Sequence, residues 1–206
     1  MHELLSLITI AGIYLMVLVS PGPNFLVVTQ SAISESRRHA LYTGLGISSG
    51  SALLATLAAT GMGLLLAQFA WLHRATQLLG GAYLIYIGIK IWRSARQPLP
   101  EKMDLGQQRS FGAAYRYGAL TNLTNPKAMV FFTTIFATLV GPDLPTWVKL
   151  ASVAEIFVLS TLWHFTLATL FSHRRVQNVY RNAKTGISRM TGGLLSVLGA
   201  HMLLTR

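Results

Sequence analysis

The stretch Ser20-Pro21-Gly22-Pro23-Asn24 lies inside the apolar run 4–33, which is long enough to cross a membrane as a helix. Proline removes a backbone donor and clashes with the preceding turn, and the glycine between the two prolines removes side-chain restraint. We therefore expect this helix to open near Pro23. The carbonyl groups around Ser20 and the N–H groups after Pro23 then need partners in the protein or in water.

A matching interruption occurs in the second half of the chain, where 122–127 reads Asn-Leu-Thr-Asn-Pro-Lys. Pro23 and Pro126 are 103 residues apart (126 − 23), which is half of the 206-residue chain. A glycine pair also recurs late in each half, at 80–81 and at 192–193. These correspondences predict two repeats of a three-helix unit. Because three is odd, the second copy is inverted relative to the first, as in many secondary transporters.

The composition is that of a membrane protein, with 52% hydrophobic and 11% charged residues, against about 25% charged in soluble domains. The apolar segments are 4–33, 40–69, 75–92, 111–140, 146–171 and 190–205. They are expected to be helices, because hydrocarbon offers no partner to an unpaired backbone group. The sequence thus predicts an all-α membrane protein with six transmembrane helices as two inverted three-helix repeats, the first and fourth broken at Pro23 and Pro126. One domain, 1–206, contains repeat one (1–93), a cytoplasmic loop (94–110) and repeat two (111–206).

The net charge of +11 reflects basic residues between the apolar segments, so we interpret it as a topology signal rather than a nucleic-acid site. Thirteen of the 17 Lys and Arg residues follow the first, third and fifth segments. Cytoplasmic loops collect such residues, which predicts that both termini face outward. The chain has no cysteine and no basic segment or cleavage pattern at its start, so the first apolar segment is expected to be retained.

The polar residues at the two breaks form the candidate substrate site. They are Ser20, Pro21, Gly22, Pro23 and Asn24 from the first break, and Asn122, Asn125, Pro126 and Lys127 from the second. Glu155 joins them as the only acidic residue deep inside a span, where an ionisable group suggests function. It is a candidate partner for Lys127 or for a substrate ammonium group. The alternative is a neutral glutamic acid that is hydrogen-bonded to a neighbouring helix.

Four segments together resemble the lysine exporter superfamily, and most closely its homoserine/threonine resistance branch, LysE/RhtB. They are SPGPN at 20–24, RRHA at 37–40, GLGISSG at 44–50 and NLTNPKA at 122–128. The resemblance covers the whole chain. It implies a bacterial inner-membrane exporter of amino acids or their derivatives, driven by protons. Family members often carry aspartate where this chain has Asn24, so a mechanism built on a membrane-centre Asp–Lys pair does not carry over.

Three classes of function remain open from the sequence. A secondary exporter accounts for the repeat, the breaks and the buried Lys127, and threonine, homoserine and its lactone or other neutral amino acids are candidate substrates. A channel or gated pore is the second class. The third is an intramembrane serine hydrolase, because Gly46-Ile47-Ser48-Ser49-Gly50 matches Gly-x-Ser-x-Gly and His164 lies downstream, although the motif needs a preceding strand.

The exporter interpretation predicts no catalytic residue, metal or cofactor, and no nucleic-acid partner. Its partners would be the amino-acid substrate, protons and membrane lipid. A lone histidine such as His164 is expected to serve packing, and the small residues Gly46 and Gly50 to allow close helix contact. Whether that contact lies within one chain or between two copies is left open.

Overall fold

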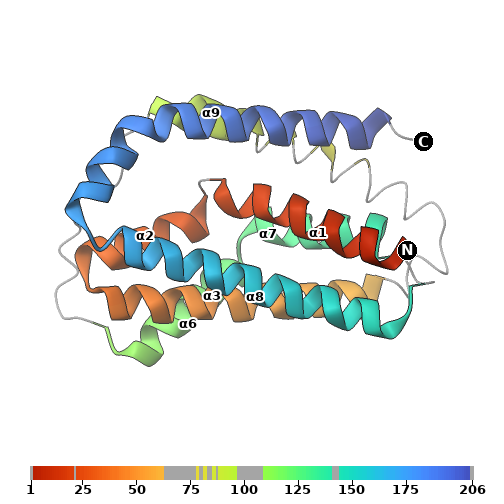
Figure 1. Cartoon of the computed structure of the whole chain (residues 1–206), viewed down its shortest axis with the longest axis horizontal. Helices are drawn as coiled ribbons and strands as arrows, with labels where there is room; N and C mark the ends of the chain where they lie inside the picture. Colours follow the sequence, from red (N-terminus) through yellow and green to blue (C-terminus); the bar gives the residue numbers. More distant parts are fainter. Residues whose placement is uncertain are drawn as a thin grey trace.

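The computed structural model describes residues 2–20, 22–62, 78, 81–82, 85–86, 88–96, 109–140 and 144–204. All regular structure in these ranges is helical, which confirms the all-α class (Figure 1). The long elements are α1 (His2–Val19), α2 (Pro23–Ser34), α3 (Arg37–Leu57), α6 (Phe111–Leu123), α7 (Pro126–Leu139), α8 (Thr146–Leu170) and α9 (Arg174–Leu204). A π-helical turn, Ala58–Met62, continues α3, and Ser94–Arg96 form a 3₁₀ turn.

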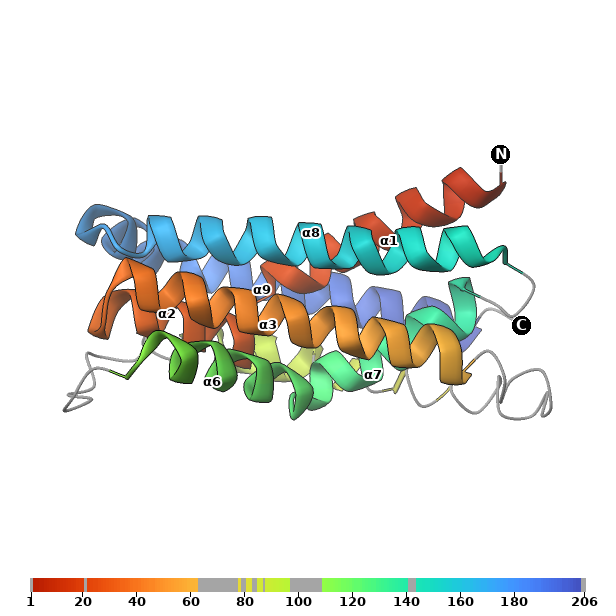
Figure 2. The same ribbon diagram turned by 90° about the horizontal axis from the view of Figure 1, so that it is seen from below.

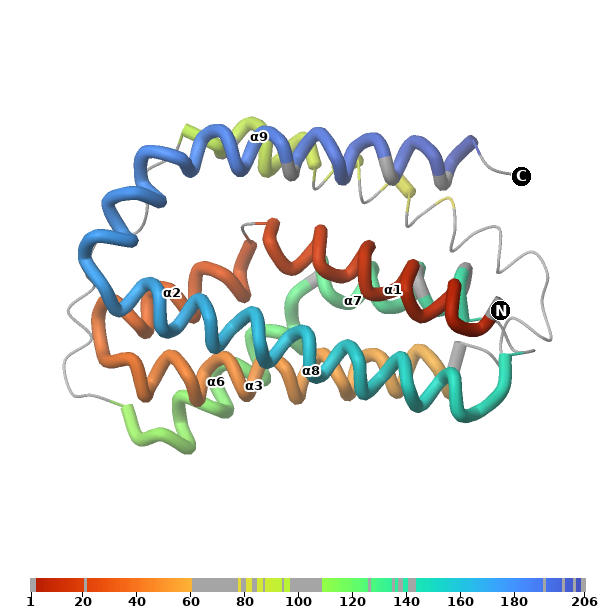
Figure 3. The backbone as a smooth tube through the Cα atoms, viewed as in Figure 1, coloured from red at the N-terminus to blue at the C-terminus, as the bar shows by residue number. Residues whose placement is uncertain are grey.

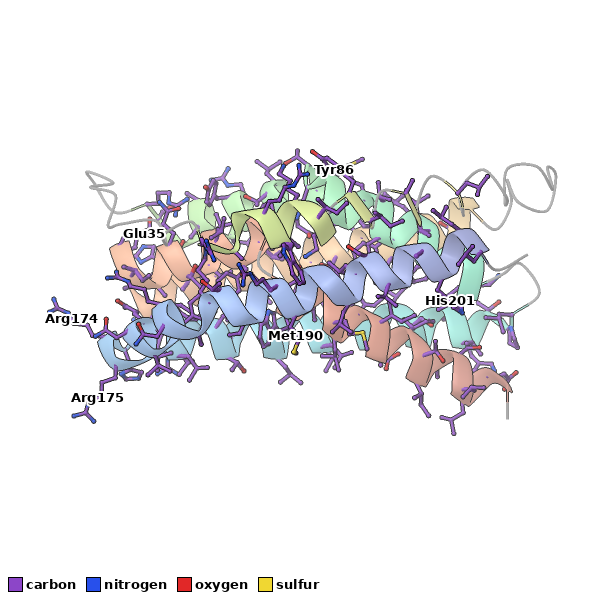
Figure 4. All side chains as sticks on the ribbon, turned by 90° about the horizontal axis from the view of Figure 1, so that it is seen from above. Glu35, Tyr86, Arg174, Arg175, Met190 and His201 are labelled. Atoms are coloured by element: carbon purple, nitrogen blue, oxygen red, sulfur yellow. The ribbon has the colours of Figure 1, made fainter. Side chains whose placement is uncertain are left out.

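Both predicted breaks are present. The axis bends by 55° between the Glu3–Val19 part of α1 and α2, and the bend lies in the middle of the molecule (Figure 3). α6 and α7 are separated at Thr124 and Asn125. The two broken helices run in opposite directions along the bundle, α1–α2 away from the end that holds both termini and α6–α7 towards it (Figure 1). Glu35, Arg174 and Arg175 lie at the other end, whereas His201 lies at the end with the termini (Figure 4).

Within the described ranges, two helices are long and apolar enough to cross a membrane, Arg37–Thr60 and Thr146–Leu170, and the bent α1–α2 pair would be a third. The six spans therefore remain a prediction. The last helix differs from expectation, because α9 begins at Arg174 and not near residue 190. The basic stretch that was expected to be a connection is helical, since Arg, Lys and Gln favour helix and no proline interrupts the segment.

α3 packs between α6 and α8 (Figure 2). Glycines allow this close contact. A methyl side chain at Gly46 would overlap the carbonyl oxygen of Tyr115, and one at Gly118 would overlap that of Thr43. One at Gly44 would lie 2.8 Å from Cβ of His164. Small residues on α3 and α6 thus bring the two backbones together within one chain.

The described part of the 78–93 segment packs on α9 through two reciprocal glycine contacts. Gly81 lies against Gly199, and Gly88 lies against Gly192. Each helix therefore carries glycines seven residues apart, and the earlier glycine of one helix meets the later glycine of the other. The two segments therefore pack antiparallel to one another.

Two apolar clusters flank the breaks. The first surrounds Ile10, Phe136 and Ile156, and the second surrounds Phe25, Ile47 and Phe171. The outer surface is apolar too, with Leu120, Leu150 and Leu162 each more than 60% exposed. Soluble proteins rarely expose so many large apolar side chains, and a lipid environment accounts for them.

A polar network joins the α2–α3 turn to the start of α6. Arg109 donates from Nε and Nη2 to the two carboxylate oxygens of Glu35, at 2.7 and 2.9 Å, and its guanidinium lies 4.3 Å from the ring centroid of Tyr117. His39 Nε2 donates to the Arg109 carbonyl at 2.7 Å. Burial opposes ionisation of Glu35, but the hydrogen bonds and charge of Arg109 outweigh it and hold the pKa of this carboxyl below its ordinary value.

We expect Glu35→Gln to lower the midpoint of thermal unfolding in detergent at pH 7 by roughly 2–8 °C, from a loss of about 1–2 kcal/mol. Because the pKa of Glu35 is lower in the folded than in the unfolded protein, this stabilisation is present above the ordinary carboxyl pKa. It disappears as the pH falls through the folded value. The difference between wild type and variant should therefore shrink in acid. Glu3→Gln, in the first turn of α1, is the control, and a pH-independent difference would contradict the assignment.

Candidate functional site

A polar cavity of about 410 Å³, its mouth included, lies where the two broken helices meet between the two apolar clusters. Its polar lining comes from α1, α2, α3, α6, α7, α8 and the two breaks, and consists of Tyr14, Ser20, Asn24, Ser51, Asn122, Asn125, Lys127 and His164. Its apolar wall includes Val17, Leu18, Ala128, Phe131 and Phe132. A few convergent polar groups beside an apolar wall are the usual lining of a site for a small solute.

Lys127 is the central group of the cavity, and its side chain is only 7% exposed. Its ammonium donates to the carbonyl oxygens of Val17 at 3.1 Å and of Ser20 at 3.3 Å. The carbonyl of Val17 would normally accept from residue 21, four positions later, but residue 21 is proline and has no N–H. The sequence break thus frees a carbonyl at the negative end of α1, where a cation is favoured.

Two helix N-termini also begin at the cavity. α2 starts at Pro23 after the extended residue Gly22, and α7 starts at Pro126. Proline suits this first position because its missing N–H would have no helical partner. Asn125 caps α7, since its Oδ1 accepts from the Lys127 N–H at 3.0 Å. Helix N-termini carry partial positive charge, so together with the Lys127 ammonium they favour an anionic group in the cavity.

Three amide side chains form a chain of hydrogen bonds across the two breaks. Asn125 Nδ2 donates to Asn24 Oδ1 at 3.2 Å, and Asn24 Nδ2 donates to Asn122 Oδ1 at 2.6 Å. Asn122 Nδ2 then donates to Ser51 Oγ at 3.2 Å. Asn24 therefore ties α2 to the second break as a donor and acceptor at once. An ionised aspartate at position 24 could only accept hydrogen bonds and could not donate one to Asn122. This neutral network therefore depends on asparagine at position 24, where family members often carry aspartate.

His164 lines the cavity and is buried, although the sequence favoured a packing role alone. Its Nδ1 lies 2.7 Å from the carbonyl oxygen of Ser160. A carbonyl only accepts, so Nδ1 carries a proton and Nε2 holds the lone pair when the ring is neutral. Gly44 fits against this residue, which shows that His164 has a packing role as well.

Most of the candidate residues lie together. Ser20, Gly22, Asn24, Asn122, Asn125 and Lys127 line the cavity, and Pro23 and Pro126 start the helices beside it. Pro21 lies outside the described residues. Glu155 is not among the lining residues, and in the described ranges it forms no ion pair with Lys127. Its Oε2 is buried without a hydrogen-bond partner there. The carbonyl groups of Val17 and Ser20 accept hydrogen bonds from Lys127, for which the Glu155 carboxylate was the candidate partner.

The sequence interpretation missed Tyr14 and Ser51. Tyr14 is the one tyrosine in the apolar run 4–33, and Ser51 lies one turn after the buried Ser48 on α3; both are signals that could have been used. Ser48 itself lies in the middle of α3 and donates to the Gly44 carbonyl at 2.9 Å. None of the described residues before it forms a strand, so the nucleophile turn of a serine hydrolase is not formed.

Helices with an apolar outer surface that enclose a polar cavity between two broken segments define a membrane transporter of small solutes. Comparison with known proteins agrees. A family model described as LysE type translocator matches residues 15–206, and the chain belongs to this family. It is a transporter and not an enzyme.

Several curated bacterial proteins are similar over nearly the whole chain. The threonine efflux protein of Escherichia coli K12 is 32% identical over 209 residues, covering 98% of this chain and 100% of the relative. The threonine efflux protein of Salmonella typhi is 31% identical, with the same two coverages. The uncharacterized membrane protein YahN of E. coli is 30% identical over 93% of this chain and 86% of its own length. No solved structure matches.

Proposed function

We propose that the protein is a secondary exporter of neutral amino acids such as threonine and homoserine in the bacterial inner membrane, driven by protons. The observation that carries this proposal is the cavity that Lys127 shares with two helix N-termini, which is suited to the carboxylate of a zwitterion. The relatives named as threonine efflux proteins support the class of substrate.

The binding site would consist of the cavity-lining residues of both breaks. Lys127 would receive the substrate carboxylate, assisted by the N–H groups at the start of α7. Asn24, Asn122 and Asn125 would position the substrate with their amide groups. Glu155 would act from outside the cavity lining. Lys127 and His164 are the basic side chains that line the cavity, and we infer that one of them carries the coupled proton in place of the carboxylate that Asn24 lacks.

The architecture that we propose is a six-helix inverted repeat. Three observations support it: the opposite directions of the two broken helices, the half-chain separation of Pro23 and Pro126, and the reciprocal glycine contacts between the 78–93 segment and α9. Apolar clusters on both sides of the cavity favour a carrier over a channel, because a carrier opens one barrier at a time.

Transport into inside-out membrane vesicles tests this function. An acidic lumen should drive uptake of radiolabelled threonine above equilibrium, with saturation and with competition by homoserine. Collapse of the pH gradient by a protonophore should abolish accumulation. Flux that neither saturates nor responds to the gradient would instead identify a channel.

We propose that the end with Arg174 faces the cytoplasm and that both termini face the periplasm. In a chain without cysteine, Arg174→Cys should react with a membrane-impermeant thiol reagent only after the cells are broken. Thr146→Cys, at the exposed start of α8, should react in intact spheroplasts. The reverse labelling pattern would overturn the orientation.

A further inference from the structure

Tyr14 carries a phenolic hydroxyl in the wall of the cavity that no interaction so far described uses. The side chain is 3% exposed and lines the cavity. Its Oη is buried, with the hydroxyls of Ser51 and Ser160 nearby, and it forms no well-aligned hydrogen bond to any described residue. Phenylalanine would fill the same space without this polar atom. The hydroxyl therefore calls for a partner within the cavity.

The ring of Tyr14 is held in a fixed position. It stacks on Phe131 with a centroid distance of 5.6 Å and contacts Phe132 at 5.7 Å, and both phenylalanines are 2% exposed. A ring packed in this way does not turn its hydroxyl towards bulk water. The hydroxyl is thus a preorganised hydrogen-bonding group rather than a flexible one.

The position of Tyr14 along α1 separates it from the group that receives the carboxylate. Tyr14 lies three residues before Val17, whose carbonyl binds the Lys127 ammonium. Three residues correspond to a rise of about 4.5 Å along a helix. A small amino acid with its carboxylate at Lys127 can reach along the cavity wall towards Tyr14 with its side chain.

We propose that Tyr14 is a specificity-determining residue whose hydroxyl hydrogen-bonds the side-chain hydroxyl of the substrate, so that the protein exports hydroxyl-bearing amino acids in preference to isosteric apolar ones. This inference rests on the proposed function. When a substrate without a hydroxyl binds, the buried polar group of the protein stays without a hydrogen-bond partner. The site therefore discriminates against that substrate. Threonine and valine are the matched pair, because they differ by a hydroxyl in place of a methyl group.

The test compares kcat/KM for threonine and for valine in proteoliposomes that contain wild type, Tyr14→Phe or Tyr42→Phe. We expect the wild type to favour threonine by roughly 5- to 100-fold. Tyr14→Phe should reduce this preference to about threefold or less, mainly by lowering kcat/KM for threonine. Tyr42 is exposed on α3 and stacks on Phe111, so Tyr42→Phe removes the same atom away from the cavity and should keep the wild-type preference.

The outcomes distinguish a failure of the role assigned to Tyr14 from a failure of the proposed exporter function. Transport of both amino acids without preference in the wild type, or an unchanged preference in Tyr14→Phe, would overturn the role of Tyr14 and leave the exporter proposal standing. Absence of transport of any amino acid by a folded wild type would overturn the proposed function itself. Thermal unfolding in detergent checks folding, and Tyr14→Phe should not lower its midpoint, because the variant removes a buried hydroxyl that has no well-aligned hydrogen bond to a described residue.

Discussion

Lys127→Met is expected to lower kcat/KM for threonine export by at least roughly 30-fold, because the cavity loses the positive charge that binds the carboxylate. Methionine keeps the length of the side chain but donates no hydrogen bond to the carbonyls of Val17 and Ser20. Lys127→Arg retains the charge and should keep part of the activity. Lys149→Met, near the start of α8 and outside the cavity, is the matched control and should transport normally.

A second substrate distinguishes electrostatic binding from a purely structural role of Lys127. Homoserine lactone keeps the ammonium group of homoserine but has no carboxylate. If Lys127 binds the carboxylate, Lys127→Met should reduce homoserine export more than lactone export. Equal losses for the two solutes, together with a lowered unfolding midpoint, would show that Lys127 mainly holds the first break together.

The triple replacement of Pro21, Gly22 and Pro23 by alanine should abolish export while leaving membrane insertion intact. Alanine at 21 supplies an N–H that can bond the Val17 carbonyl within a continuous helix, in competition with Lys127. Straightening the 55° bend would also move the N-terminus of α2 away from the cavity. The measurement is proton-driven threonine uptake in inside-out vesicles, normalised to the amount of protein in the membrane.

Pro145→Ala is the control for that replacement, since Pro145 precedes α8 outside the cavity and should tolerate the change. Unchanged transport in the triple variant would show that the first break serves packing alone. Loss of the protein from the membrane would show that Lys127 needs the freed carbonyls in order to fold.

Much of the fold followed from local rules. The broken helices could be predicted because proline acts within one turn of its own position, and Pro23 and Pro126 indeed begin α2 and α7. The bounds of α8 agree with the apolar segment 146–171 to within a residue. The start of α9 could not be found from hydropathy, because a helix with a charged face continues into the apolar segment without any change in backbone structure.

The site was predictable in its members but not in its pairings. The site residues at the breaks could be recognised because they are proline, asparagine and lysine in an apolar run. The partners of Lys127 are backbone carbonyl groups, which a sequence does not reveal. Glu155 was favoured because opposite charges attract. The structure instead satisfies the ammonium with dipoles at the end of α1. Tyr14 was overlooked because a tyrosine in an apolar helix is usually a packing residue, and only the position of its hydroxyl distinguishes the two cases.

The hydrogen bonds of the second break bear on the order of assembly during synthesis. The Lys127 ammonium and the amide nitrogens of Asn122 and Asn125 donate hydrogen bonds to Val17, Ser20, Ser51 and Asn24, all of which are in the part of the chain made first. By the time the segment that contains Lys127 is synthesised, the carbonyl groups that accept from the Lys127 ammonium are already in the membrane. The N-terminal half thus acts as a template on which the broken α6–α7 segment can insert, and the reverse order would leave the polar side chains of this segment without partners in lipid.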